Sequence, residues 1–289
     1  DVLRPLLIAA ALAAAVSFYQ GFVDLSFLNQ GFWTYMLRAP GTLGDPNKLG
    51  SVVSFWTVGA MVFAWRLPRP WSLVVSACAI AGGCVAVWVC GSRTGLAAVG
   101  ISLAIAALEA IRYWWRHRTS LGMSGTRVAM TAAGAVLLLV AVVGVLQGAS
   151  THTVVQRGTL GYVPFIGDRS LANSANELLW ERFGYGLAAI EMIKEHPLTG
   201  IGPGMFHWLV IDYGRDAGYS GDRLLVSDNA QNWFRHNLAE LGLLGMLPLL
   251  WWCGVFIRQL FSRSDDGDAL MLGLLRAVFI GFFSASVFG

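Results

Sequence analysis

Seven long apolar runs dominate this sequence and limit what the chain can fold into. They cover roughly residues 5–23, 49–65, 71–90, 95–113, 128–147, 236–257 and 269–288. The hydrocarbon core of a bilayer is about 30 Å thick, and a helix of about 20 apolar residues crosses it. Only 13% of the residues are charged, whereas about a quarter are charged in a typical soluble protein. The sequence therefore predicts an all-α, polytopic helical membrane protein with about seven transmembrane helices.

The runs are predicted to form a single integral membrane domain over residues 1–289. The chain starts at Asp1 without a methionine and stops at Gly289 inside an apolar run, so we expect it to be a fragment of a longer protein. Its four cysteines all lie in apolar runs, and their spacing fits neither a zinc site nor a disulfide framework.

The basic residues between the runs are distributed unevenly. If every run crosses the membrane once, one side receives Arg4, Arg66, Arg69, Arg112, Arg116, Arg118, Arg127, Arg258 and Arg263. The positive-inside rule makes that side cytoplasmic. We therefore interpret the chain as a multi-pass membrane protein whose opposite side is extracytoplasmic.

The opposite side holds residues 24–48, the turn at 91–95 and the segment 148–235. This last segment is too long to be a mere connection, so we expect a large, partly helical extracytoplasmic loop. Residues 176–200 within it have apolar side chains at helical spacing and end in a Pro and a Gly. They predict an amphipathic helix near the membrane surface.

Four stretches on the extracytoplasmic side carry polar residues in unusual settings, and we call them the first to fourth motif stretches. They are "RAPGTLGDPNKLG" at 38–50, "GSRTG" at 91–95, the residues from Arg182 to the "HPLTGIGPGMF" that ends at Phe206, and "SDNAQNWFRHNLAELGLLG" at 227–245. An arginine in an apolar setting is unfavourable unless it lies at the membrane surface or has a partner.

In their order and topology, the four stretches resemble the O-antigen ligase-like family. This family includes O-antigen ligases, O-antigen polymerases and protein O-oligosaccharyltransferases. The matching positions are Arg38, Gly41-Thr42, Pro46-Asn47, Ser92 to Gly95, Arg182 fifteen residues before Pro197, and Ala239 to Gly245.

The resemblance implies a multi-pass glycosyltransferase of the bacterial inner (plasma) membrane, with residues 148–235 in the periplasm. Such an enzyme takes a glycan from polyprenyl diphosphate and transfers it to an acceptor hydroxyl at the periplasmic face. The acceptor would be lipid A-core, another glycan or a protein. Planar guanidinium groups suit bidentate phosphate binding, so Arg93 and Arg182 are expected to converge on the diphosphate as catalytic residues. The expected substrate-binding residues are Arg38, Asn47, Ser92, Gln231, Asn232 and Arg235.

One position departs from the family pattern. The family has a His-Asn pair nine residues before the last motif's glutamate, but Gln231 and Asn232 stand there in this chain, before Glu240. Glutamine cannot act as a base. His236 lies five residues further along and is our candidate general base, unless the reaction proceeds without a histidine.

Other interpretations stay open at this point. Arg93 could anchor a turn, Arg182 could be a solvated surface residue, and His236 could be an interfacial residue. The chain could also be a small-anion transporter or a catalytically silent assembly partner. Because no acidic or histidine cluster has ligand spacing, we expect no metal and no cofactor. The bilayer is an expected partner, and nucleic acid is not.

Overall fold

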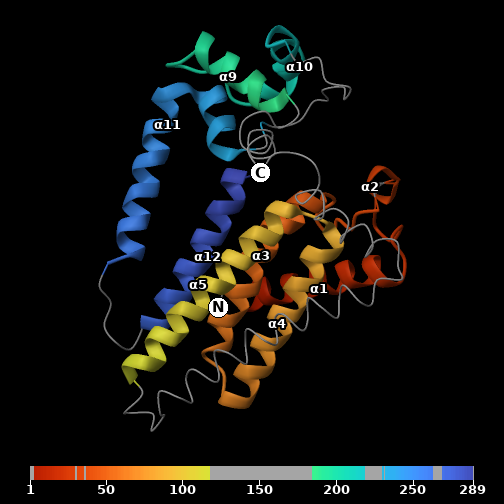
Figure 1. Cartoon of the computed structure of the whole chain (residues 1–289), viewed down its shortest axis with the longest axis vertical. Coiled ribbons are helices and arrows are strands. Elements are labelled where there is room, and N and C mark those ends of the chain that lie inside the picture. The colour runs from red at the N-terminus through yellow and green to blue at the C-terminus, as the bar shows by residue number, and fades with distance from the viewer. Residues whose placement is uncertain are drawn as a thin grey trace, which may run out of the picture. The chain divides into compact units, whose positions relative to one another are not determined.

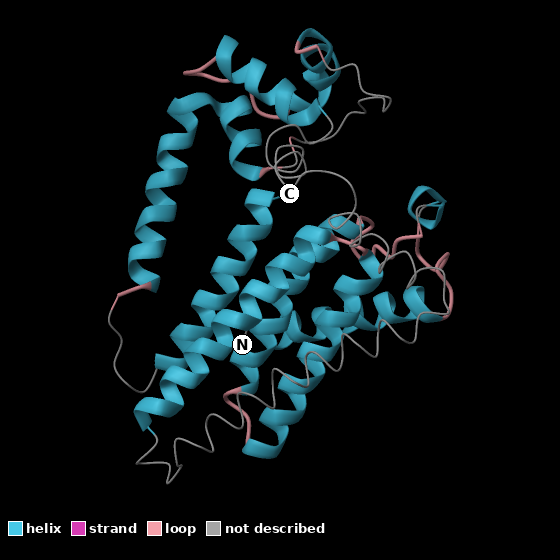
Figure 2. Cartoon of the chain, in the orientation of Figure 1, coloured by secondary structure: helices cyan, strands magenta, loops and turns pink. Residues whose placement is uncertain are grey.

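The computed structural model describes residues 3–29, 31–35, 37–117, 184–218, 230, 232–262 and 269–288 (Figure 1). These residues form helices and loops, with no strand among them (Figure 2). The chain divides into two compact units. The first unit comprises Asp1–Pro164 and Arg263–Ala285, and the second comprises Phe165–Ser262 and Ser286–Gly289.

Six of the seven expected runs are helices in the described part of the chain. They are α1 (Leu3–Phe22), α3 (Pro46–Ala64), α4 (Arg69–Cys90), α5 (Arg93–His117), α11 (Trp233–Leu260) and α12 (Ala269–Phe288). Among the described helices, α4, α5, α11 and α12 are long and apolar enough to cross a membrane. The class of helical membrane protein is thus confirmed. The count of seven spans is not, and the run at 128–147 lies outside the described residues.

Local sequence signals set the ends of α3 and α4. The Asp45 side chain accepts hydrogen bonds from the N–H groups of Asn47 and Lys48, and Pro46 occupies the first helical position. Both features favour a helix start. α4 ends at Gly91, whose φ of 62° lies in the left-handed region, a conformation that favours glycine at a helix end.

In the first unit, the amino-terminal ends of α3 and α5 meet where two glycines face each other. A Cβ atom added to Gly95 would lie 2.6 Å from the Cα atom of Gly50. Small residues allow such close backbone approach between membrane helices. Since α4 connects α3 to α5, α3 and α5 run parallel, and the first two motif stretches lie at the same end of this unit.

Basic residues lie at the other end of the first unit. The Trp65 ring, just after α3, makes an edge contact with Tyr113 near the end of α5 at a centroid distance of 5.6 Å. Arg66 follows in the α3–α4 loop, and the last turns of α5 contain Arg112 and Arg116. Within this unit, these arginines thus lie at the opposite end from the first two motif stretches, as the sequence predicts. Which of the two ends faces the cytoplasm stays a prediction.

The described helices of the second unit are α9 (Tyr185–Glu195), α10 (Phe206–Asp216) and α11. Its core consists of Tyr185, Ala188, Ala189, Met192, Phe206, Val210, Ala230 and Ala239. α9 confirms part of the helix expected at 176–200, and it ends just before Pro197. Leu187 and Ile190, expected on its apolar face, are only half-buried, because the face centred on Ala188 and Met192 is the one that packs.

α10 lies against α9 and was not expected from the sequence. The Tyr213 hydroxyl of α10 donates a hydrogen bond to Glu195 Oε2 of α9 at 2.5 Å. This bond, reinforced by partial burial, raises the pKa of Tyr213 to about 12. One further short helix, α2 (Gly31–Tyr35), precedes Arg38 in the first unit.

Candidate functional site

Arg38 joins three segments at the motif end of the first unit. Its Nε atom donates a hydrogen bond to the Cys90 carbonyl oxygen, and its Nη2 atom donates to Asn47 Oδ1, each at 2.8 Å. The guanidinium carbon also lies 5.4 Å from the centre of the Trp33 ring. The positively charged Arg38 side chain therefore links the first motif stretch to the start of α3 and to the end of α4.

Ser92, which was expected to bind substrate, is buried and makes a structural hydrogen bond at the start of α5. Only 2% of the residue is exposed, and its Oγ atom accepts a hydrogen bond from the Gly95 N–H at 3.1 Å. That bond satisfies one of the amino-terminal N–H groups of α5. A Cβ atom added to Gly50 would lie 2.5 Å from the Ser92 Cβ atom, so the second motif stretch packs directly on α3.

Of the two arginines expected to bind diphosphate, the structure describes only the backbone of Arg93. Arg93 is the first residue of α5, next to Ser92, but its side chain lies outside the described part of the structure, as does the whole of Arg182. Gln231 also lies outside the described residues. The convergence of Arg93 and Arg182 therefore stays a prediction.

Arg38→Lys is expected to lower stability by about 2 kcal/mol, because an ammonium group cannot reproduce both planar hydrogen bonds of the guanidinium fork. Thermal unfolding of the purified chain in detergent measures the effect. Arg66→Lys is the matched control at an exposed position and should change stability by less than about 0.5 kcal/mol. Equal effects of the two replacements would show that the Arg38 contacts contribute little.

In the second unit, the third and fourth motif stretches are joined by backbone hydrogen bonds. The N–H groups of Ile201 and Gly202 donate to the carbonyl oxygens of Ala239 and Glu240, each at 2.9 Å. In return, the N–H groups of Leu243 and Leu244 donate to the carbonyl oxygens of Pro197 and Leu198 at 2.9 and 3.0 Å. The loop at 197–202 thus supplies partners for backbone groups of α11.

These bonds surround a break inside α11. Gly242 has φ 62° and ψ −171°, so the helix is interrupted there and nearby backbone groups lose their helical partners. Gly200 faces Gly242 at very short range. A Cβ atom added to Gly242 would lie 2.3 Å from the Leu198 carbonyl oxygen, and one added to Gly200 would lie 2.3 Å from the Glu240 carbonyl oxygen. Glycine is required at both positions.

Glu240 connects this junction to α10. The residue is only 8% exposed, and its Oε1 atom accepts a hydrogen bond from the Phe206 N–H at 3.1 Å. Phe206 is the first residue of α10, where N–H groups lack helical partners and the helix dipole favours negative charge. The carboxylate therefore fixes the start of α10 against α11.

His236 lies one helical turn before Glu240, and its ring contacts three other residues. Its Nε2 atom is 3.6 Å from Glu240 Oε1. Its Nδ1 atom lies 3.4 Å from the Ala230 backbone nitrogen, whose N–H points at it. The ring also meets Phe206 edge-on at a centroid distance of 5.1 Å. This arrangement assigns the neutral ring's proton to Nε2 and its lone pair to Nδ1.

Asn232 and Arg235, both expected to bind substrate, support the start of α11. The Asn232 Oδ1 atom accepts a hydrogen bond from the Arg235 N–H at 2.9 Å, and its Nδ2 atom donates to the Val287 carbonyl oxygen at 2.5 Å. The Arg235 Nη2 atom donates to the Ala230 carbonyl oxygen at 2.9 Å. Arg235 therefore helps to place Ala230, and through it His236, whereas Asn232 caps the start of α11.

Comparison with protein-family models, with curated proteins and with solved structures gave no match. Within the described part of the chain, no three His, Cys, Asp or Glu residues are grouped so that they could hold a metal ion. Sequence reasoning did not place Glu240 in the site. Its spacing of four residues from His236 was the available signal, because such residues face each other on a helix.

Proposed function

We propose that the chain is a membrane glycosyltransferase of the O-antigen ligase or polymerase type. It would transfer a glycan from a polyprenyl diphosphate carrier to an acceptor hydroxyl at the periplasmic face of the inner membrane. The observation that carries the proposal is the pairing of the four motif stretches. The first packs on the second in one unit, and the third packs on the fourth in the other.

The proposed reaction forms one bond and breaks another at the anomeric carbon. The acceptor oxygen bonds to that carbon, and the bond from the carbon to the diphosphate oxygen breaks. The polyprenyl diphosphate leaves with the electron pair, and the acceptor proton passes to a base. Arg93 and Arg182 are the proposed ligands of the diphosphate, because guanidinium groups stabilise negative charge that grows on the leaving oxygen.

His236 is the proposed base, and its surroundings define how it would act. The lone pair that can take a proton is on Nδ1, where the Ala230 N–H now points at a separation of 3.4 Å. This is longer than an ordinary N–H bond to an acceptor, so an acceptor hydroxyl could replace it. Glu240, on the Nε2 side, would then stabilise the imidazolium ion that forms.

The most direct test is to analyse the cell-envelope glycans that accumulate in a bacterium lacking this gene. Long glycan linked to the polyprenyl carrier is expected if the chain is a ligase. Single carrier-linked repeats are expected if it is a polymerase, and loss of glycan from proteins is expected if it modifies proteins. An unchanged glycan profile would contradict the proposal and favour the anion transporter.

A silent assembly partner would be revealed by complementation. Reintroducing the wild-type gene should restore the glycan profile in every case. If a variant lacking the side chains of Arg93, Arg182 and His236 restores it equally well, the chain acts by assembly and not by catalysis.

A further inference from the structure

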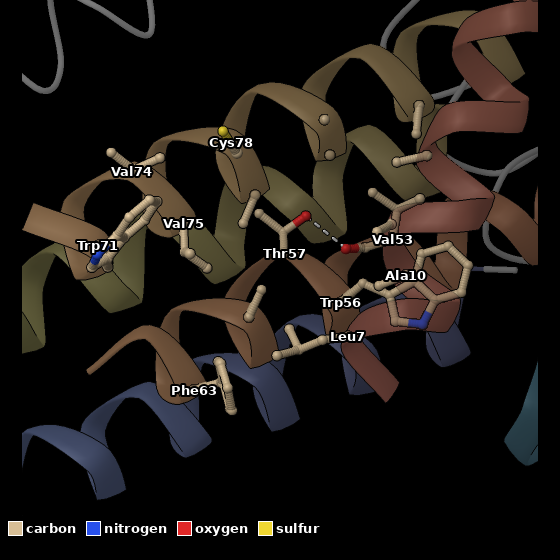
Figure 3. Close-up of a pocket in the computed structure, with 17 residues that line it drawn as sticks. Leu7, Ala10, Val53, Trp56, Thr57, Phe63, Trp71, Val74, Val75 and Cys78 are labelled. Carbon is tan, nitrogen blue, oxygen red and sulfur yellow. Dashed lines mark hydrogen bonds between the residues drawn. The ribbon is translucent and has the colours of Figure 1, made fainter. Parts of the chain in front are cut away.

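An apolar groove runs among α1, α3 and α4 in the first unit (Figure 3), and its volume is about 380 Å³. This volume falls in the range of ligand pockets, about 300–1,000 Å³. Ala and Gly residues from α1 and α4 form much of its wall, among them Ala10, Ala14, Ala79 and Gly82. The small side chains leave space between helices that otherwise pack closely.

The chemistry of the lining suits a hydrocarbon chain. No charged residue lines the groove, and its one hydroxyl belongs to Thr57. That hydroxyl donates a hydrogen bond to the Val53 carbonyl oxygen of its own helix at 2.8 Å (Figure 3). A polar ligand would lose its hydration in this groove and meet few polar groups in return, whereas an apolar chain has no such cost.

The groove is open from its Trp71 end to Cys78 near its middle and is closed at the other end. Trp71 and Val74 are 62% and 50% exposed, whereas Val53 and Ala86 are 1% and 2% exposed. The open end therefore lies near the α3–α4 loop, which carries Arg66. The closed end lies near the motif stretches, because Ala86 is one helical turn from Cys90, which accepts the Arg38 hydrogen bond.

The groove is long enough to hold a hydrocarbon chain through one leaflet of a bilayer. Trp71 and Ala86 both line it, and the fifteen-residue helical rise from one to the other is about 22 Å. A leaflet contributes half of a hydrocarbon core of about 30 Å, or about 15 Å. Tryptophan is typical of membrane interfaces, and an arginine there attracts lipid phosphate.

We propose that this groove binds one acyl chain of a membrane phospholipid. The lipid belongs to the leaflet at the Trp71 end, and its phosphate lies at the level of Arg66. The chain enters beside Trp71 and fills the space between α1 and α4, so the lipid is a structural component of the first unit. This site is separate from the proposed transfer reaction and does not depend on it.

The test uses the full chain, purified in a mild detergent and supplied with dipalmitoyl phosphatidylglycerol. Native mass spectrometry should detect one tightly retained phospholipid per chain. Gly82→Leu should reduce that occupancy by about fivefold or more, the ratio given by about 1 kcal/mol. A Cβ atom at Gly82 meets only Ala14, at the ordinary contact distance of 3.7 Å, and Gly82 lines the groove, so the rest of the leucine side chain takes up groove space.

Gly100→Leu is the matched control. Gly100 is an exposed residue of α5 with no atom within 4 Å of an added Cβ, and this variant should retain the lipid. Ala79→Leu fills the groove from another position and tests the same expectation if Gly82→Leu does not fold. Wild-type protein without a retained phospholipid, groove-filling variants that retain it fully, or displacement of it by polyprenyl phosphate at equal concentration would each overturn the proposal.

Discussion

His236→Ala is expected to lower the turnover of glycan transfer by about 100-fold or more while donor binding stays nearly unchanged. Removing a general base typically reduces the rate by about 100- to 10,000-fold, and the imidazole is not a proposed ligand of the diphosphate. Transfer from a polyprenyl diphosphate donor by the purified chain gives turnover, and its dependence on donor concentration gives the effect on binding.

His207→Ala is the control for this prediction. His207 lies in the same unit, on the exposed side of α10, and its replacement should leave turnover within about twofold of wild type. Gln231→Ala should also have a smaller effect than His236→Ala. If His236→Ala keeps full activity and Gln231→Ala abolishes it, His236 is not the base, and the arginines would act on a weakly activated acceptor.

Gly242→Ala is expected to lower stability by about 3 kcal/mol or more, through two effects that add. A Cβ atom there would lie 2.3 Å from the Leu198 carbonyl oxygen, and overpacking of this kind costs about 1–3 kcal/mol. An alanine at φ 62° adds about 1–3 kcal/mol of backbone strain. Thermal unfolding in detergent, together with proteolysis of the loop at 197–202, measures the result.

Gly204→Ala separates these two effects. Gly204 also has a positive φ, at 76°, but an added Cβ meets no atom within 4 Å. This variant should therefore lose only the strain contribution, about 1–3 kcal/mol. If both alanine variants unfold at the same temperature, the contact between α11 and the loop at 197–202 does not limit stability.

Helix positions in the first unit could be predicted closely because the local signals are strong. The run expected at 71–90 is α4 at Arg69–Cys90, bounded by a proline before it and by Gly91 after it. α10 was missed for the opposite reason. It follows the glycine-rich "GIGPG" turn and has no side-chain cap, so nothing in the sequence marks its start.

The site was less predictable, because its contacts join residues far apart in the chain. Arg38 and Asn47 could be singled out by the motif they share, but their common contact with the end of α4 is a tertiary feature. Glu240 bonds the start of α10, 34 residues earlier. The pairing of Gly200 with Gly242 likewise has no signature in either stretch alone.

The break at Gly242 also sets the depth at which His236 lies. The part of α11 that follows it, from Leu243 to Leu260, is about 27 Å long, close to the hydrocarbon thickness of a bilayer. Large apolar side chains such as Leu244, Leu247 and Trp251 are exposed along it. We therefore expect the chain to enter the hydrocarbon at the break. His236, no more than about 9 Å further along the helix, would then lie at the level of lipid headgroups, where the proposed reaction could draw on a water-borne acceptor and a carrier's diphosphate.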